Sequence, residues 1–143
     1  MIATILSLIL FVIFTLLGSI HIYWLLGGKW GLKNVIPTKE NQATTLEIPQ
    51  FATLIVALVL LFFGLIYLVK SEFIIIQFPN WISNYGYWII PSIFILRAIG
   101  DFNYVGLFKK KKNTEFAKAD SKWFIPLCLT IGTLGIWIQL MNK

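Results

Sequence analysis

The 143-residue chain is 58% hydrophobic and 13% charged, and its twelve Lys and Arg against six Asp and Glu give a net charge of +6. Soluble domains carry about a quarter charged residues, so these values and a mean hydropathy of +0.81 predict an integral membrane protein with a single domain, residues 1–143. The basic residues do not belong to a folded soluble domain, which excludes a nucleic-acid-binding protein. One cysteine and one histidine exclude an internal disulfide and a Cys/His zinc site, and we expect neither a metal nor a cofactor.

Two apolar runs lie in the first half of the chain. Residues 2–26 contain no charged side chain, and at about 1.5 Å per residue they can cross a hydrocarbon layer of about 30 Å. A cleaved signal peptide is the alternative, and it is disfavoured because no basic region precedes the run and no small-x-small cleavage site follows it. Residues 51–69 form a second uncharged run after Pro49, which predicts a second span.

Two more spans are predicted in the second half, at residues 81–99 and 123–141. The third is the least regular, because Asn84, Gly86 and Pro91 interrupt it, and Pro91 should kink the helix. Pro126 lies in the first turn of the fourth span, where proline is tolerated. The four runs together predict an all-α integral membrane protein, a four-helix bundle whose transmembrane helices run alternately up and down.

Lysines gather on one side of this predicted bundle. The opposite side holds only Lys70 and Lys143, whereas the loops after the first and third spans hold Lys29, Lys33, Lys39, Lys109, Lys110, Lys111, Lys112, Lys118 and Lys122. The positive-inside rule therefore predicts that both loops are cytoplasmic and both termini extracytoplasmic. The run from Lys109 to Lys112 is predicted to be a lipid-facing anchor, in which each lysine contributes about 1 kcal/mol near an anionic surface.

Polar residues also converge at this cytoplasmic side, and every span contributes at least one of them near its end. They are His21 and Trp24, Glu47, Arg97 and Asp101, and Asp120. Buried charges at a membrane edge are costly unless they pair or bind a ligand. The pattern predicts a polar site at the cytoplasmic mouth of the bundle.

Helical spacing gives this site a geometry. Arg97 is the only arginine, and Asp101, four residues later, can meet it on one helix face together with Tyr104, provided that the helix continues through Gly100. If Gly100 instead caps the helix, Asp101 lies just beyond it and needs Arg97 or His21 to offset the helix dipole. Gly18, three residues before His21, should let another helix approach closely.

Each of these residues has a simpler alternative role, and the sequence leaves both open. Arg97 can snorkel to a lipid phosphate, and His21 can form a hydrogen bond between helices. Asp120 fits the N-cap of the fourth span, where its carboxylate would accept from free amides. Glu47 fits either a solvated residue or a residue in the first turn of the second span.

Several segments of the chain, taken together, resemble a known protein family. The resemblance rests on His21-Ile-Tyr-Trp24-Leu-Leu-Gly-Gly28, on residues 97–109 and on Thr114 to Ala117, followed by Asp120 and the Pro-Leu-Cys-Leu segment from Pro126. Together these segments resemble the bacterial family called domain of unknown function 3995. The resemblance implies a small four-span inner-membrane protein without an established activity, and signature residues that include His21, Trp24, Arg97, Asp101, Tyr104 and Asp120. The chain departs from the family pattern at Lys122, Trp123 and Phe124.

Three functions are compatible with this pattern. The first is a binding protein that holds an anionic lipid headgroup or a small ligand, with Arg97 as the charge clamp and His21, Trp24, Asp101, Tyr104 and Asp120 around it. The second is an enzyme acting on a lipid or hydrophobic substrate, with His21 as acid/base oriented by Asp101 or Asp120. It is disfavoured because no nucleophile motif is recognisable. The third is a transporter or proton-handling protein, and a homo-oligomer is compatible with each of them.

Overall fold

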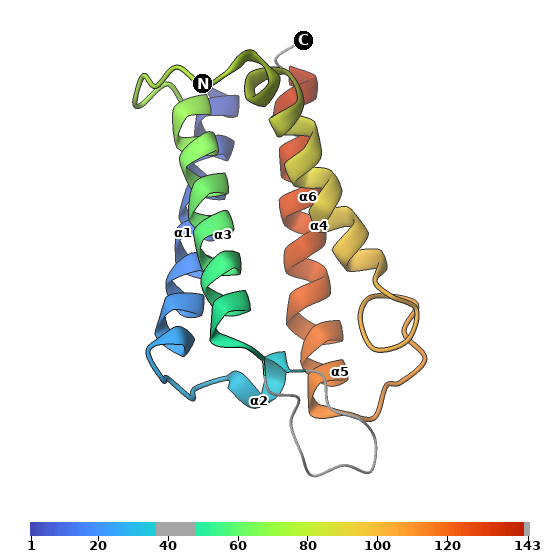
Figure 1. Cartoon of the computed structure of the whole chain (residues 1–143). Coiled ribbons are helices and arrows are strands. Elements are labelled where there is room, and N and C mark those ends of the chain that lie inside the picture. The colour runs from blue at the N-terminus through green and yellow to red at the C-terminus, as the bar shows by residue number, and fades with distance from the viewer. Residues whose placement is uncertain (37–47, 142–143) are drawn as a thin grey trace.

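The computed structural model describes residues 1–36 and 48–141, and within them all regular structure is helical. Figure 1 shows the arrangement of the helices. The elements are α1 (Ile2–Leu25), α2 (Leu32–Val35), α3 (Gln50–Lys70), a π-helical segment (Ile82–Gly86), α4 (Tyr87–Ile99), α5 (Glu115–Ala119), a second π-helical segment (Asp120–Phe124) and α6 (Ile125–Met141). The first π-helical segment leads directly into α4, and the second joins α5 to α6.

Three helices in the described residues are long and apolar enough to cross a membrane, namely Ile2–Leu25, Gln50–Lys70 and Glu115–Met141. The first two coincide closely with the spans predicted at residues 2–26 and 51–69. The third contains the span predicted at residues 123–141 but begins at Glu115, because α5 and the second π-helical segment extend it. The helix over residues 81–99 is not among the three, so a fourth span stays a prediction.

The four long helices pack as two pairs. α1 lies along α3 and α4 lies along α6, while α1 also contacts α6 (Figure 1). The ring of Phe14 on α1 joins the pairs, since its centroid is 5.8 Å from that of Tyr67 on α3 and 5.3 Å from that of Phe94 on α4. Gly18 supports the α1–α3 contact as predicted, because a Cβ there would lie 2.7 Å from a side-chain carbon of Leu61.

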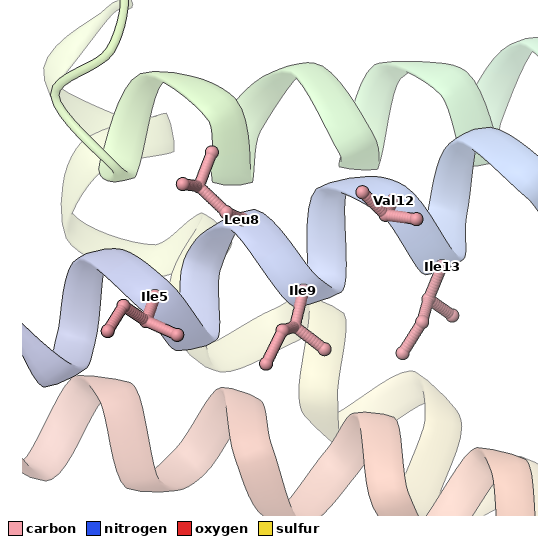
Figure 2. A pocket seen from close by; sticks show the side chains of 5 residues that line it. All are labelled: Ile5, Leu8, Ile9, Val12 and Ile13. Atoms are coloured by element: carbon pink, nitrogen blue, oxygen red, sulfur yellow. The ribbon is translucent and has the colours of Figure 1, made fainter.

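The outer surface of the bundle is apolar. Figure 2 shows a shallow groove on α1 lined by Ile5, Leu8, Ile9, Val12 and Ile13, with the isoleucines directed towards α6. The lining consists of aliphatic side chains, and several of them are exposed. Such a surface is stable in a hydrocarbon layer and costly in water, which agrees with the membrane class predicted from composition.

The two ends of the bundle differ in charge. α1 begins and α6 ends at one end, whereas α2 and α5 contact each other at the opposite end (Figure 1). We call that opposite end, together with the loop from Gly100 to Thr114, the lysine-rich end. Its exposed lysines are Lys29, Lys33, Lys110, Lys112, Lys118 and Lys122.

Candidate functional site

The loop that follows α4 is closed by its own aspartate. Gly100 caps α4 with φ 86° and ψ −168°, a conformation that is open almost only to glycine. One carboxylate oxygen of Asp101, Oδ1, then accepts from the backbone amides of Asn103 at 2.9 Å, Tyr104 at 2.8 Å and Val105 at 2.9 Å. These bonds, with that from the Val105 amide the largest contribution, lower the pKa of the Asp101 carboxyl. The loop therefore has a defined shape.

Replacing Asp101 with Ala should lower the Tm by a few degrees at pH 7, because three amides lose their acceptor. The pKa of Asp101 is lowered in the folded protein, so the carboxylate stabilises the fold above its unfolded pKa of about 3.9. This contribution is lost as the pH falls through the lowered folded value. The Tm difference between wild type and Asp101→Ala, measured in detergent, should therefore shrink towards pH 3. A difference that does not depend on pH would contradict the proposed role of the ionised carboxylate.

The loop is fixed to the helices on both sides. The amide of Leu107 donates to the carbonyl of Ala98 at 2.8 Å, which turns the chain back onto the end of α4. The amide of Gly106 donates to Oδ2 of Asp120 at 2.9 Å. Gly106 has φ 93°, and its backbone packs directly on Ile99 and Gly100. The loop thus connects α4 with the start of the last long helix.

Asp120 is the centre of the site. Its side chain is fully buried, with 0% exposure, and each carboxylate oxygen binds one cation. Oδ1 lies 2.9 Å from Nη2 of Arg97, and Oδ2 lies 3.0 Å from Nζ of Lys109. The Lys109 ammonium also donates to Oγ of Ser121 at 2.7 Å and to the carbonyl of Gly106 at 3.2 Å. We call Arg97, Gly106, Lys109, Asp120 and Ser121 the Asp120 cluster.

The structure corrects three sequence predictions at this cluster. Arg97 does not pair with Asp101, because Gly100 ends the helix and the Asp101 carboxylate turns to the loop amides. Asp120 is not an N-cap, since the helix begins earlier and Thr114 caps it by accepting from the Ala117 amide at 3.0 Å. Lys109 is not a lipid-facing anchor, because only 3% of its side chain is exposed and its ammonium is bound to Asp120.

Two other predicted site residues lie apart from the Asp120 cluster. Nδ1 of His21 lies 2.8 Å from the carbonyl oxygen of Leu17, one turn earlier on the same helix, and among the described residues the histidine makes no hydrogen bond to another helix. Nε1 of Trp24 donates to the carbonyl of Trp30 at 2.8 Å. Both residues line a pocket between α1, α2 and α3 whose lining includes no member of the Asp120 cluster.

The predicted catalytic arrangement is therefore not formed. The carboxylates of Asp101 and Asp120 are bound to other groups, and neither orients the imidazole of His21. Tyr104 lies on the loop with the Lys111 ammonium 5.5 Å from its ring centroid, and it is not part of the cluster. Glu47 lies outside the described residues. Within residues 1–36 and 48–141, no three His, Cys, Asp or Glu side chains are grouped so that they could hold a metal ion.

Comparison with known proteins gives a family. Residues 14–135 match the family described as protein of unknown function (DUF3995). The chain belongs to this family. No curated protein matches the chain, and no solved structure matches it.

The DUF3995 match includes every residue of the Asp120 cluster and both His21 and Trp24. It supports the resemblance found in the sequence and a small membrane protein of unknown function, without assigning an activity. Sequence reasoning missed Gly106, Lys109 and Ser121 as cluster members. Lys109 is the first residue of a run of four lysines, and nothing in that run distinguishes it from its neighbours. The folded loop brings its ammonium to the Gly106 carbonyl and to Asp120.

Proposed function

We propose that this protein is a bacterial inner-membrane protein with four transmembrane helices, whose lysine-rich end lies in the cytoplasm and binds anionic phospholipid headgroups. The positive-inside rule supports this orientation, because the lysine-rich end carries nine Lys and Arg residues against three Asp and Glu in the described residues. Both ends of the chain would then lie on the extracytoplasmic side. The anionic lipids of the cytoplasmic leaflet would then bind the positive charges of the lysine-rich end.

The observation that carries the proposal is the charge of the Asp120 cluster. Two cations, Arg97 and Lys109, share the single carboxylate of Asp120, so one positive charge remains without compensation inside the cluster. Lys109 is buried, whereas one third of the Arg97 side chain is exposed, at 33%. Nη1 of Arg97 is itself buried and has no hydrogen-bond partner among the described residues, so a phosphate would have to enter beside the exposed part of the side chain to reach it. A guanidinium with a free donor suits a phosphate group, which can take two parallel hydrogen bonds.

The surface of the loop supports the same ligand. Phe102, Leu107 and Phe108 are all more than half exposed, and the rings of Phe102 and Phe108 are 6.1 Å apart. Exposed lysines 110 and 112 follow directly. Aromatic and aliphatic side chains enter the membrane interface, while lysine ammonium groups reach the phosphates. The loop would thus hold Arg97 at the depth of the headgroups.

The test is native mass spectrometry of the protein in mild detergent, titrated with phosphatidylglycerol or with phosphatidylcholine of the same chains. We expect the wild type to bind phosphatidylglycerol more tightly. Arg97→Gln should weaken that binding by about tenfold or more, because a hydrogen bond between charged groups contributes at least about 1.4 kcal/mol. Asp120 keeps Lys109 and the Gly106 amide in this variant, so the fold should survive.

The control is Lys70→Gln, which removes a cation at the other end of the bundle, at the end of α3. It should leave phosphatidylglycerol binding unchanged. Equal binding of the two lipids by the wild type would overturn the proposal, as would an equal effect of the two variants. The Tm of each variant is measured in parallel, so that loss of binding is compared between folded proteins.

A further inference from the structure

A second cavity lies at the lysine-rich end, between the last turn of α1, the short helix α2 and the start of α3. Its volume is about 460 Å³, within the range of about 300 to 1,000 Å³ that is typical of small-molecule sites. We call it the His21 pocket. Its walls include His21 and Trp24 from α1, Leu32 and Val35 from α2, and Thr53 and Val56 from α3. No described residue that lines it carries a full charge, apart from what protonation would give His21.

The hydrogen bond of His21 determines what its ring offers to this pocket. A carbonyl oxygen only accepts, so the 2.8 Å contact with Leu17 requires that Nδ1 carry the hydrogen and donate it. In the neutral ring, Nε2 then has a free lone pair and is an acceptor. No described residue donates to Nε2. A hydroxyl group of a ligand in the pocket can supply that donor.

The imidazole is held in place by its neighbours. The ring of Trp24 meets it edge to face, with centroids 5.0 Å apart and an interplanar angle of 68°. Trp24 is itself held by the hydrogen bond from its indole to the Trp30 carbonyl at 2.8 Å. The acceptor is therefore preorganised, and a ligand would not have to order it on binding.

The remainder of the lining is mainly aliphatic, with Leu25, Leu32, Val35, Ile36 and Val56 among its members. We propose that the His21 pocket binds a neutral amphiphile whose hydroxyl group donates to Nε2 of His21 and whose hydrocarbon part lies against these aliphatic side chains. A charged headgroup is disfavoured because no described residue of the lining supplies a countercharge. The pocket and the Asp120 cluster have no residue in common, so this inference does not depend on the proposed function.

The chain offers an unusually direct measurement, since His21 is its only histidine. Protein labelled with ¹⁵N-histidine and reconstituted in phosphatidylcholine nanodiscs gives one pair of imidazole nitrogen resonances. We expect titration with 1-monooleoylglycerol to move the Nε2 resonance in a saturable way and to leave the Nδ1 resonance nearly unchanged. Methyl oleate, which has the same chain but no hydroxyl, should produce no such shift.

Two variants test the location. Ala52→Phe adds a ring at a residue that lines the pocket and should weaken binding of 1-monooleoylglycerol at least about tenfold. Ser19→Ala is the matched control on α1, because Ser19 is exposed, donates to the Thr15 carbonyl and is not among the residues that line the pocket. It should bind like the wild type. The comparison of the two lipids on the wild type does not depend on whether the Ala52 variant folds.

Several outcomes would overturn the inference. These are an Nε2 resonance that shows a bound hydrogen before any ligand is added, an equal response to methyl oleate, and an unchanged affinity in a folded Ala52→Phe variant. Glycerol alone distinguishes the source of the hydroxyl. If it saturates the same shift at similar concentrations, the ligand is a water-soluble alcohol and the amphiphile is excluded.

Discussion

Replacing Asp120 with Ala should destabilise the protein by about 3 to 5 kcal/mol, the usual cost of removing one partner from a buried ion pair. The ammonium of Lys109 is almost fully buried and would lose the one carboxylate that it binds among the described residues, and the Gly106 amide would lose its acceptor. Arg97 would lose its partner as well, but its side chain can reach solvent. The measurement is the free energy of unfolding in detergent, followed by circular dichroism.

A double variant separates the stranded charge from other effects of the substitution. Asp120→Ala combined with Lys109→Met removes both buried charges, and it should be more stable than Asp120→Ala alone. The control is Glu115→Ala, since Glu115 is 74% exposed and its oxygen lies 3.6 Å from Lys118. Exposed pairs of this kind contribute about 0 to 1 kcal/mol. If Asp120→Ala costs no more than Glu115→Ala, the cluster does not hold the loop to the helix.

The sequence predicted the long apolar helices well, because an uncharged run of about 20 residues has few possible structures other than a membrane-spanning helix. The runs at residues 2–26 and 51–69 became α1 and α3, and Gly18 became a close helix contact. Arg97 and Asp120 were both selected as site residues, because buried charges near a membrane edge need partners. The choice of partner was wrong, since helical spacing favoured Asp101.

The error has a local physical cause. Gly100 was recognised as a possible cap, and it does end α4. Spacing along a helix then no longer applies, and the carboxylate of Asp101 satisfies amides two to four residues ahead of it. The burial of Lys109 could not be predicted from composition, because a run of four lysines is typical of a solvated segment. Only the folded loop brings its ammonium next to Asp120.

Replacing Gly106 with Ala should destabilise the protein by about 3 kcal/mol or more, because backbone strain and steric overlap add together. Gly106 has φ 93°, which disfavours any residue with a Cβ. A Cβ at this position would overlap the carbonyl oxygen of Ile99 and lie 2.5 Å from Cα of Gly100. Both obstacles are backbone atoms, so no side chain can move aside. The measurement is again the free energy of unfolding in detergent.

Gly27 provides a matched control for the backbone term. Its φ of 94° is nearly the same, but apart from its chain neighbours no described residue has an atom within 4 Å of a Cβ placed there. Gly27→Ala should therefore cost only the strain of the left-handed conformation, about 1 to 2 kcal/mol. The difference between the two variants measures how tightly the loop packs on the end of α4. If the two variants lose the same free energy of unfolding, glycine is needed at position 106 only for its positive φ. The close packing of Gly106 on the end of α4 then contributes little to stability.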